Sequence, residues 1–210
     1  LKLFFTASYV ALAAFVGAFA DSMPKWRVML ISNTIKIGGC LFLFLGMHPL
    51  FAYALIGLGA AAYSPAKYGI LTEYLPHRLL VVANGWIEGL TVAAIIIGTV
   101  LGGIMIRDDV SGWLLALNLP VISNAFEASI LVIGSLYLIA AAFNFYIPDT
   151  GVDHKPLRND PLYLLHDFKH CLQLLWRDKL GQISLAVTTL FWGAGATLQF
   201  IVIKWAEYNL

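Results

Sequence analysis

Six stretches of this chain are apolar for long enough to cross a lipid bilayer as helices. A membrane-spanning helix needs about 20 mainly apolar residues, because the hydrocarbon is about 30 Å thick and a helix rises about 1.5 Å per residue. The stretches are residues 1–20, 28–46, 49–71, 79–106, 125–148 and 182–208. Since 60% of the residues are hydrophobic and only 12% are charged, the chain cannot cover a soluble domain with polar surface. It is therefore predicted to be an all-α membrane protein, a polytopic helical bundle with six membrane spans.

The largest polar segment, residues 149–181, lies between the last two spans. Asp160 followed by Pro161 is typical of a helix start, because the acid caps the first amides and proline suits the first helical position. Apolar residues then repeat on one helical face, namely Leu162, Leu165, Phe168, Leu172, Leu175 and Trp176. This pattern predicts an interfacial amphipathic helix that lies on the membrane surface.

The order of these segments predicts two bundles joined by a linker. Residues 1–148 would form part of an N-terminal transmembrane bundle, residues 149–181 a cytoplasmic linker, and residues 182–210 the first helix of a C-terminal bundle. The chain begins without Met and inside an apolar stretch. We therefore expect an internal fragment of a longer polytopic protein.

Basic residues are distributed unevenly among the loops, which predicts the orientation. If residues 21–27 are cytoplasmic, eight Lys and Arg lie on that side and three on the other. The eight are Lys25, Arg27, Arg78, Lys155, Arg158, Lys169, Arg177 and Lys179, and the three are Lys2, Arg107 and Lys204. Because cytoplasmic loops are enriched in Lys and Arg, the loops 21–27, 73–83 and 149–181 are predicted to be cytoplasmic.

Lys67 is a charge inside the third predicted span, and it follows a run of Gly and Ala over residues 57–62. Centring an ammonium group in hydrocarbon costs about 2.5–3.5 kcal/mol on insertion scales, so such a residue usually faces a partner, a cavity or a ligand. Small residues allow a neighbouring helix to approach closely. Pro65 removes one backbone donor just before the lysine. Ser64, Lys67 and Tyr68 are therefore predicted to contact substrate.

Two further polar residues within spans are substrate-binding candidates. Lys36 lies near the midplane of the second span, one turn after Asn33. Two roles fit this lysine equally well. One is substrate binding or gating, and the other is a structural role in which the lysine pairs with an acid or snorkels along its own stem. Gln199 lies in the last span, where Gly193 and Gly195 would leave a groove.

Acidic residues near the cytoplasmic ends of the spans suggest a charge network that gates the protein. Asp21, Lys67 and Glu88 fall at similar depth, and a cluster of the three could act as a latch that opens when the helices part. Lys25 and Arg27, in the loop after Asp21, are assigned to the same gating network. For Glu88, the alternative is an acid that stabilises the start of its helix.

Several function classes find no support in the sequence. The net charge is +1, so no nucleic-acid partner is predicted. The two cysteines, Cys40 and Cys171, define neither a disulfide framework nor a metal site. No nucleophile and base are placed together as catalysis requires, and no phosphate-binding glycine loop is present. We therefore expect no enzyme activity, no metal and no cofactor.

Two kinds of motif resemble known transporters. Residues 17–27, GAFADSMPKWR, resemble the loop signature of the major facilitator superfamily, in which a glycine, an aspartate four residues later and a basic cluster join two helices. Residues 59–71 (GAAAYSPAKYGIL), 83–88 (ANGWIE) and 191–195 (FWGAG) are similar to the bacterial lysophospholipid transporters of that superfamily. The resemblance implies that the fragment holds helices two to seven of twelve.

The resemblance also implies a function. Such a protein would move lysophospholipids, of the lysophosphatidylethanolamine type, from the outer to the inner leaflet of the bacterial cell inner membrane by alternating access. An acyltransferase would then restore the second chain, so a cytoplasmic acyltransferase is a possible partner beside the lipids. Two alternatives stay open: a proton-coupled carrier of drugs or small metabolites, for which Glu88 is the candidate acid, and a non-transporting membrane scaffold for an acyltransferase.

Overall fold

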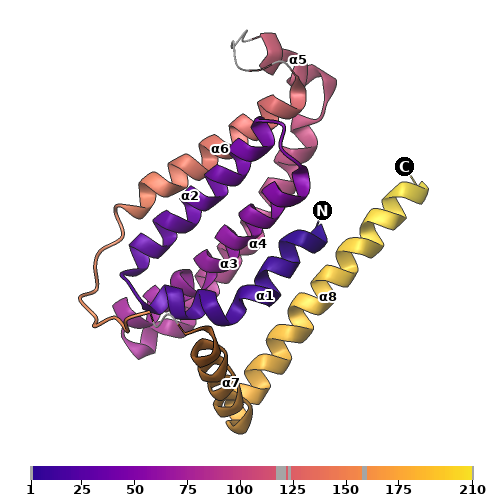
Figure 1. The fold of residues 1–210 in the computed structure, drawn as a ribbon. Helices are drawn as coiled ribbons and strands as arrows, with labels where there is room; N and C mark the ends of the chain where they lie inside the picture. The colour runs from indigo at the N-terminus through magenta and orange to yellow at the C-terminus, as the bar shows by residue number, and fades with distance from the viewer. Residues whose placement is uncertain (1, 117–121, 123, 158–159, 210) are drawn as a thin grey trace. The chain divides into compact units, whose positions relative to one another are not determined.

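The computed structural model describes residues 2–116, 122, 124–157 and 160–209, and among these it describes the side chains of all but residues 2–6, 8 and 203. In chain order the helices are α1 (Lys2–Asp21), α2 (Lys25–Phe44), α3 (Pro49–Tyr74), α4 (His77–Met105), α5 (Asp108–Ala116), α6 (Ala125–Asn144), α7 (Pro161–Arg177) and α8 (Lys179–Asn209) (Figure 1). The described residues contain no strand. The chain divides into a first unit, Leu1–Asn159, and a second unit, Asp160–Leu210.

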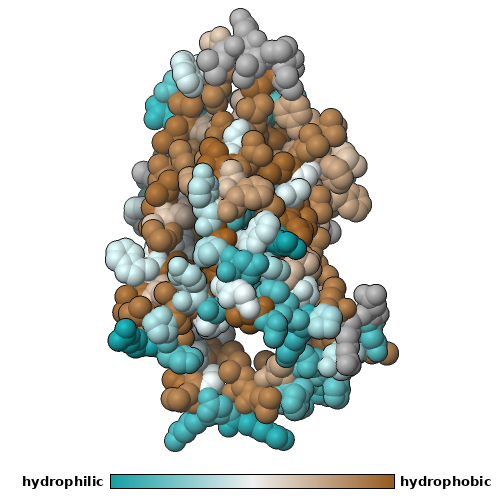
Figure 2. Space-filling model, turned by 90° about the vertical axis from the view of Figure 1, so that its left-hand side faces the viewer, coloured by the Kyte–Doolittle hydropathy of each residue, from teal (hydrophilic) through white to brown (hydrophobic). Residues whose placement is uncertain are grey.

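Five helices of the described chain are long and apolar enough to cross a membrane, namely α2, α3, α4, α6 and α8. They coincide with five of the six predicted spans. In the remaining one, α1, the apolar part that the structure describes in full runs over Tyr9–Asp21 and is shorter than a span. In Figure 2, hydrophobic side chains cover most of the upper part of the face, and hydrophilic side chains gather toward its lower part. The all-α membrane fold predicted from the sequence is therefore confirmed.

Side-chain caps set the starts of several helices. The Nδ1 atom of His48 accepts a hydrogen bond from the amide of Leu50 (3.3 Å) where α3 begins with Pro49. At α6 the side chain of Asn124 accepts from the amide of Glu127 (2.9 Å). These bonds satisfy helix N–H groups that have no partner within the helix.

The predicted amphipathic helix is confirmed as α7. The carboxylate of Asp160 accepts hydrogen bonds from the amides of Leu162 (3.0 Å) and Tyr163 (3.4 Å), and Pro161 occupies the first turn. The helix ends at Arg177, and the Asp178 carboxylate accepts from the amide of Gly181 (2.9 Å) at the turn into α8. A side chain at Gly181 would collide with the backbone oxygen of Leu175, so glycine is required at this turn.

In the first unit, α3 packs against α1 and α2, and α2 also packs against α6. Small residues make the contact between α2 and α3 close. A Cβ atom at Gly59 would lie 2.7 Å from the backbone oxygen of Ser32, and one at Gly39 would lie 3.1 Å from the oxygen of Ala52. The predicted role of the Gly and Ala run in α3, to let a neighbour approach, is therefore confirmed.

The connection predicted over residues 107–124 contains the short helix α5, which ends at Ala116. Before it, α4 has no buried residue in the described structure. Because α4 is strongly apolar, we expect its surface to face lipid.

Candidate functional site

Lys36 lies among polar and aromatic side chains from three helices of the first unit. It is 8% exposed, and its Nζ atom donates a hydrogen bond to Oδ1 of Asn33 (3.1 Å). The ammonium group also lies 4.4 Å from the ring centre of Tyr63 on α3 and 5.4 Å from that of Tyr137 on α6. Cation–π contacts of this kind stabilise a positive charge that is removed from water.

The backbone of α3 provides the space for this lysine. A Cβ atom at Gly59 would come within 2.8 Å of Cγ of Lys36, so the glycine allows the lysine stem to pass. The amide nitrogen Nδ2 of Asn33 is buried and has no hydrogen-bond partner among the described atoms. Because a buried amide donor without a partner is costly, this cluster has one donor and one cation available for an anionic group.

Lys67 lies in a second polar cluster, between α3 and α4. Its Nζ atom donates to Oγ1 of Thr91 (3.1 Å) and lies 4.6 Å from the ring centre of Tyr68. The hydroxyl of Tyr68 in turn donates to Oε1 of Glu88 (2.6 Å). The structure therefore brings together three residues that the sequence analysis named as candidates, Lys67, Tyr68 and Glu88. Thr91 was missed by sequence reasoning, although its position one turn after Glu88 on α4 could have suggested it.

Both lysines lie in helices that are apolar enough to span a membrane, Lys36 in α2 and Lys67 in α3. Among the described salt bridges, neither lysine has a carboxylate within 4.0 Å. An anion bound near either amine would therefore compensate its charge.

The predicted latch of Asp21, Lys67 and Glu88 is not formed. In the described part of the chain Lys67 pairs with neither acid, because Asp21 lies against Lys25 and Glu88 is hydrogen-bonded to Tyr68. Glu88 also keeps its Oε2 atom buried without a partner among the described atoms.

The charge cluster that does form is built around Lys25 at the start of α2. Its side chain is 4% exposed, and its Nζ atom lies 2.8 Å from the Asp21 carboxylate and 3.2 Å from the Glu73 carboxylate. It also donates to the backbone oxygen of Ala20 (2.8 Å). The cluster therefore joins the ends of α1, α2 and α3.

The segment after α6 is attached to the same cluster. The hydroxyl of Thr150 donates to Oε2 of Glu73 (2.9 Å), and the amide of Lys155 donates to the backbone oxygen of Asp21 (3.2 Å). Glu73 and Thr150 were missed by sequence reasoning, because both fall in segments that were treated as surface loops. Glu73 could have been identified from its position just after the third predicted span, on the same side of the membrane as the basic loop 21–27.

No described hydrogen bond or salt bridge joins the remaining predicted site residues, Arg27, Ser64 and Gln199, to Lys36 or Lys67. Arg27 stacks on the ring of Trp26, 5.1 Å from its centre, and takes no part in the described salt bridges. Ser64 forms a side-chain hydrogen bond with Tyr9 on α1. Gln199 is exposed on α8, in the second unit, so its proximity to either lysine stays a prediction. Among the described residues, no three His, Cys, Asp or Glu side chains are grouped as metal ligands would be.

Comparison with known proteins places this arrangement in a family. The sequence profile of the Major Facilitator Superfamily matches residues 3–207. The chain is similar over its full length to proteins named lysophospholipid transporter LplT, at 41% identity in Yersinia enterocolitica, 41% in Serratia proteamaculans and 40% in Yersinia pestis.

It covers 48%, 49% and 48% of these relatives, respectively, so it spans about half the length of the curated relatives it matches. No solved structure matches the chain. The profile match covers nearly all of the chain and agrees with the all-α arrangement of membrane-spanning helices. The chain belongs to the major facilitator superfamily.

Proposed function

We propose that this chain is part of a transporter that moves lysophospholipids across a bacterial inner membrane. The observation that carries the proposal is the pair of lysines, Lys36 and Lys67, inside membrane helices with no carboxylate within salt-bridge distance among the described residues. The names of the relatives, which share about 41% identity with this chain, support the substrate class.

The chemistry of a lysophospholipid fits these lysines. Its phosphate is an anion, and a membrane protein that carries it through hydrocarbon must offer a compensating cation. Lys36 and Lys67 supply two, and the free Nδ2 atom of Asn33 can donate a further hydrogen bond. Tyrosine rings lie within cation–π distance of each lysine and stabilise the positive charge. Ser64 and Tyr68 would contact the polar head, and Gln199 would reach it from the second bundle.

Transport would proceed by alternating access of two bundles, with residues 1–148 in the first, residues 149–181 as a cytoplasmic linker and residues 182–210 opening the second. The Lys25 cluster would hold the cytoplasmic ends of α1, α2 and α3 together as one rigid body. The proposed direction is from the outer to the inner leaflet, where a cytoplasmic acyltransferase would consume the product.

The test is the flipping of fluorescent lysophosphatidylethanolamine in proteoliposomes that contain the full-length parent protein. The variants are Lys36→Met and Lys67→Met, with Lys36→Arg and Lys67→Arg to keep the charge. Lys204→Ala is the matched control, because this lysine lies on a membrane-spanning helix but is 68% exposed and paired with Glu207.

We expect the methionine variants to lose at least about tenfold in flipping, the loss that 1.4 kcal/mol of phosphate interaction produces, and the control to keep wild-type activity. A parent protein that flips no lysophospholipid would refute the proposed function. If both methionine variants flip lysophospholipid normally, the proposed function stands, but the two lysines take no part in it.

A proton-coupled carrier remains the second candidate, because the Glu88 carboxylate has one buried oxygen without a described partner. It predicts uptake of a small metabolite or drug that collapses when the proton gradient is removed and that is lost in Glu88→Gln. Flipping of lysophospholipid that is independent of the gradient would exclude it.

A further inference from the structure

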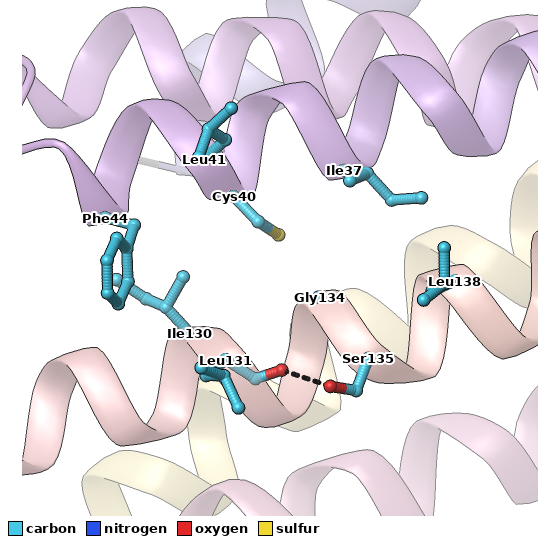
Figure 3. A pocket seen from close by; sticks show the side chains of 9 residues that line it. All are labelled: Ile37, Cys40, Leu41, Phe44, Ile130, Leu131, Gly134, Ser135 and Leu138. Carbon is cyan, nitrogen blue, oxygen red and sulfur yellow. Dashed lines mark hydrogen bonds between the residues drawn. The ribbon is translucent and has the colours of Figure 1, made fainter. Parts of the chain in front are cut away.

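An apolar groove of about 350 Å³ lies between α2 and α6 in the first unit (Figure 3). Its rim is open to the surroundings, since Leu41, Leu131 and Leu138 are 52%, 38% and 63% exposed. The groove runs from Ile37 to Phe44 along α2, which is roughly 10 Å of helix at 1.5 Å per residue. The helices on both sides are apolar enough to span a membrane, so we expect the groove to open to lipid.

No polar group of the groove is available to a polar ligand. The hydroxyl of Ser135 donates to the backbone oxygen of Leu131 (2.8 Å), as Figure 3 shows. The thiol of Cys40 is free and buried. Opposite it, Gly134 leaves space that a side chain would fill, since its Cβ atom would lie 3.8 Å from that of Cys40. The groove therefore suits a hydrocarbon ligand.

The Lys36 cluster adjoins the groove along both helices, since Lys36 and Tyr137 are next in sequence to the lining residues Ile37 and Leu138. Lys36 lies one turn before Cys40 on the same face of α2, and Tyr137 lies about one turn after Gly134 on the same face of α6. The Lys36 ammonium group and the Tyr137 ring are themselves 5.4 Å apart. One end of the apolar groove is thus next to a buried cation, an arrangement that matches a molecule with an anionic head and one hydrocarbon tail.

We propose that the α2–α6 groove binds the acyl chain of the lysophospholipid while its phosphate interacts with Lys36. This inference rests on the proposed function and adds a site for the tail. The volume lies at the lower end of the roughly 300–1,000 Å³ typical of ligand pockets, so the groove has room for one acyl chain. A two-chain phospholipid would leave its second chain outside the groove, so a single-chain lipid fits it better.

The first experiment is photolabelling of the reconstituted full-length protein with lysophosphatidylethanolamine that carries a diazirine in its acyl chain. We expect mass spectrometry to find adducts within residues 37–44 and 130–138. Unlabelled lysophosphatidylethanolamine should remove the adducts, whereas two-chain phosphatidylethanolamine should not. Adducts only at other helices, or equal competition by the two-chain lipid, would overturn the proposal, the latter because the groove would then bind bulk lipid.

The second experiment fills the groove and measures the chain-length dependence of flipping. Gly134→Leu is compared with Gly134→Ala, because a methyl group at this position meets only an ordinary contact at 3.8 Å. The wild type should prefer octanoyl over butyryl lysophosphatidylethanolamine, because only the longer of these two chains extends through the groove. In the leucine variant this preference should fall about tenfold, the factor expected from losing two buried methylene groups, and in the alanine variant it should stay.

A general folding defect lowers flipping of both lipids and leaves their ratio unchanged, so the ratio separates a groove effect from damage. An unchanged ratio in Gly134→Leu would overturn the proposal. Such a result in a protein that flips lysophospholipid normally would leave the proposed function intact, whereas a wild type without flipping would refute the function itself.

Discussion

Neutralising Glu73 should destabilise the protein far more than neutralising Asp21, although both carboxylates contact the same lysine. The side chain of Lys25 is 4% exposed, that of Glu73 is 14% exposed and that of Asp21 is 68% exposed. An ion pair in water contributes about 0–1 kcal/mol, whereas removing one partner of a buried pair costs about 3–5 kcal/mol, because the remaining charge stays buried.

These values predict that Glu73→Ala lowers the free energy of unfolding by about 3 kcal/mol. The loss is at the lower end of that range because Lys25 keeps its bonds to Asp21 and to the backbone oxygen of Ala20. Asp21→Asn should cost less than about 1 kcal/mol. At roughly 2–4 °C per kcal/mol for a unit of this size, the Glu73 variant should melt about 6–12 °C below the wild type.

The assay is the loss of the monomer peak in size-exclusion chromatography of the detergent-solubilised full-length protein after heating. The double variant Lys25→Met with Glu73→Met is the control, because replacing both charges with apolar groups leaves no buried ion unpaired, and it should melt above Glu73→Ala. If Asp21→Asn lowers the melting temperature as much as Glu73→Ala, or if the double variant is the least stable, the assignment of Glu73 as the main partner of Lys25 is wrong.

Three further outcomes test the packing and capping described above. Gly59→Ala should destabilise by about 1–3 kcal/mol in the same heating assay, because its Cβ atom would lie 2.7 Å from a backbone oxygen of α2, whereas Gly38→Ala, with its nearest contact at 3.8 Å, should be neutral. Tyr68→Phe removes the 2.6 Å bond to Glu88 and should cost about 1–3 kcal/mol; an unchanged melting temperature would contradict the burial of that carboxylate. Asp160→Ala should destabilise the start of α7 by about 0.5–2 kcal/mol, visible as faster hydrogen exchange of the first-turn amides with no change in the rest of the helix.

The sequence alone determined where the long apolar helices and α7 form, whereas α5 falls in a segment that was predicted to be a connection. Long apolar runs leave a backbone no alternative to helices in hydrocarbon, because every N–H and C=O group must bond within the segment. The start of α7 could also be predicted from the sequence, because Asp160 and Pro161 act on adjacent backbone groups. The unusual lysines, Lys36 and Lys67, were also identified by sequence, because a charge inside an apolar run is costly wherever its helix packs.

The tertiary structure decided which side chains meet. Depth in the membrane placed Asp21, Lys67 and Glu88 at one level, but depth does not fix the face of a helix that a side chain occupies. That face depends on how the helices rotate and approach, and in this protein the close contact at Gly59 sets the approach of α3 to α2. Lys25 therefore pairs with Glu73, and Lys36 lies between rings of α3 and α6, contacts between residues far apart in the chain that local sequence patterns do not encode.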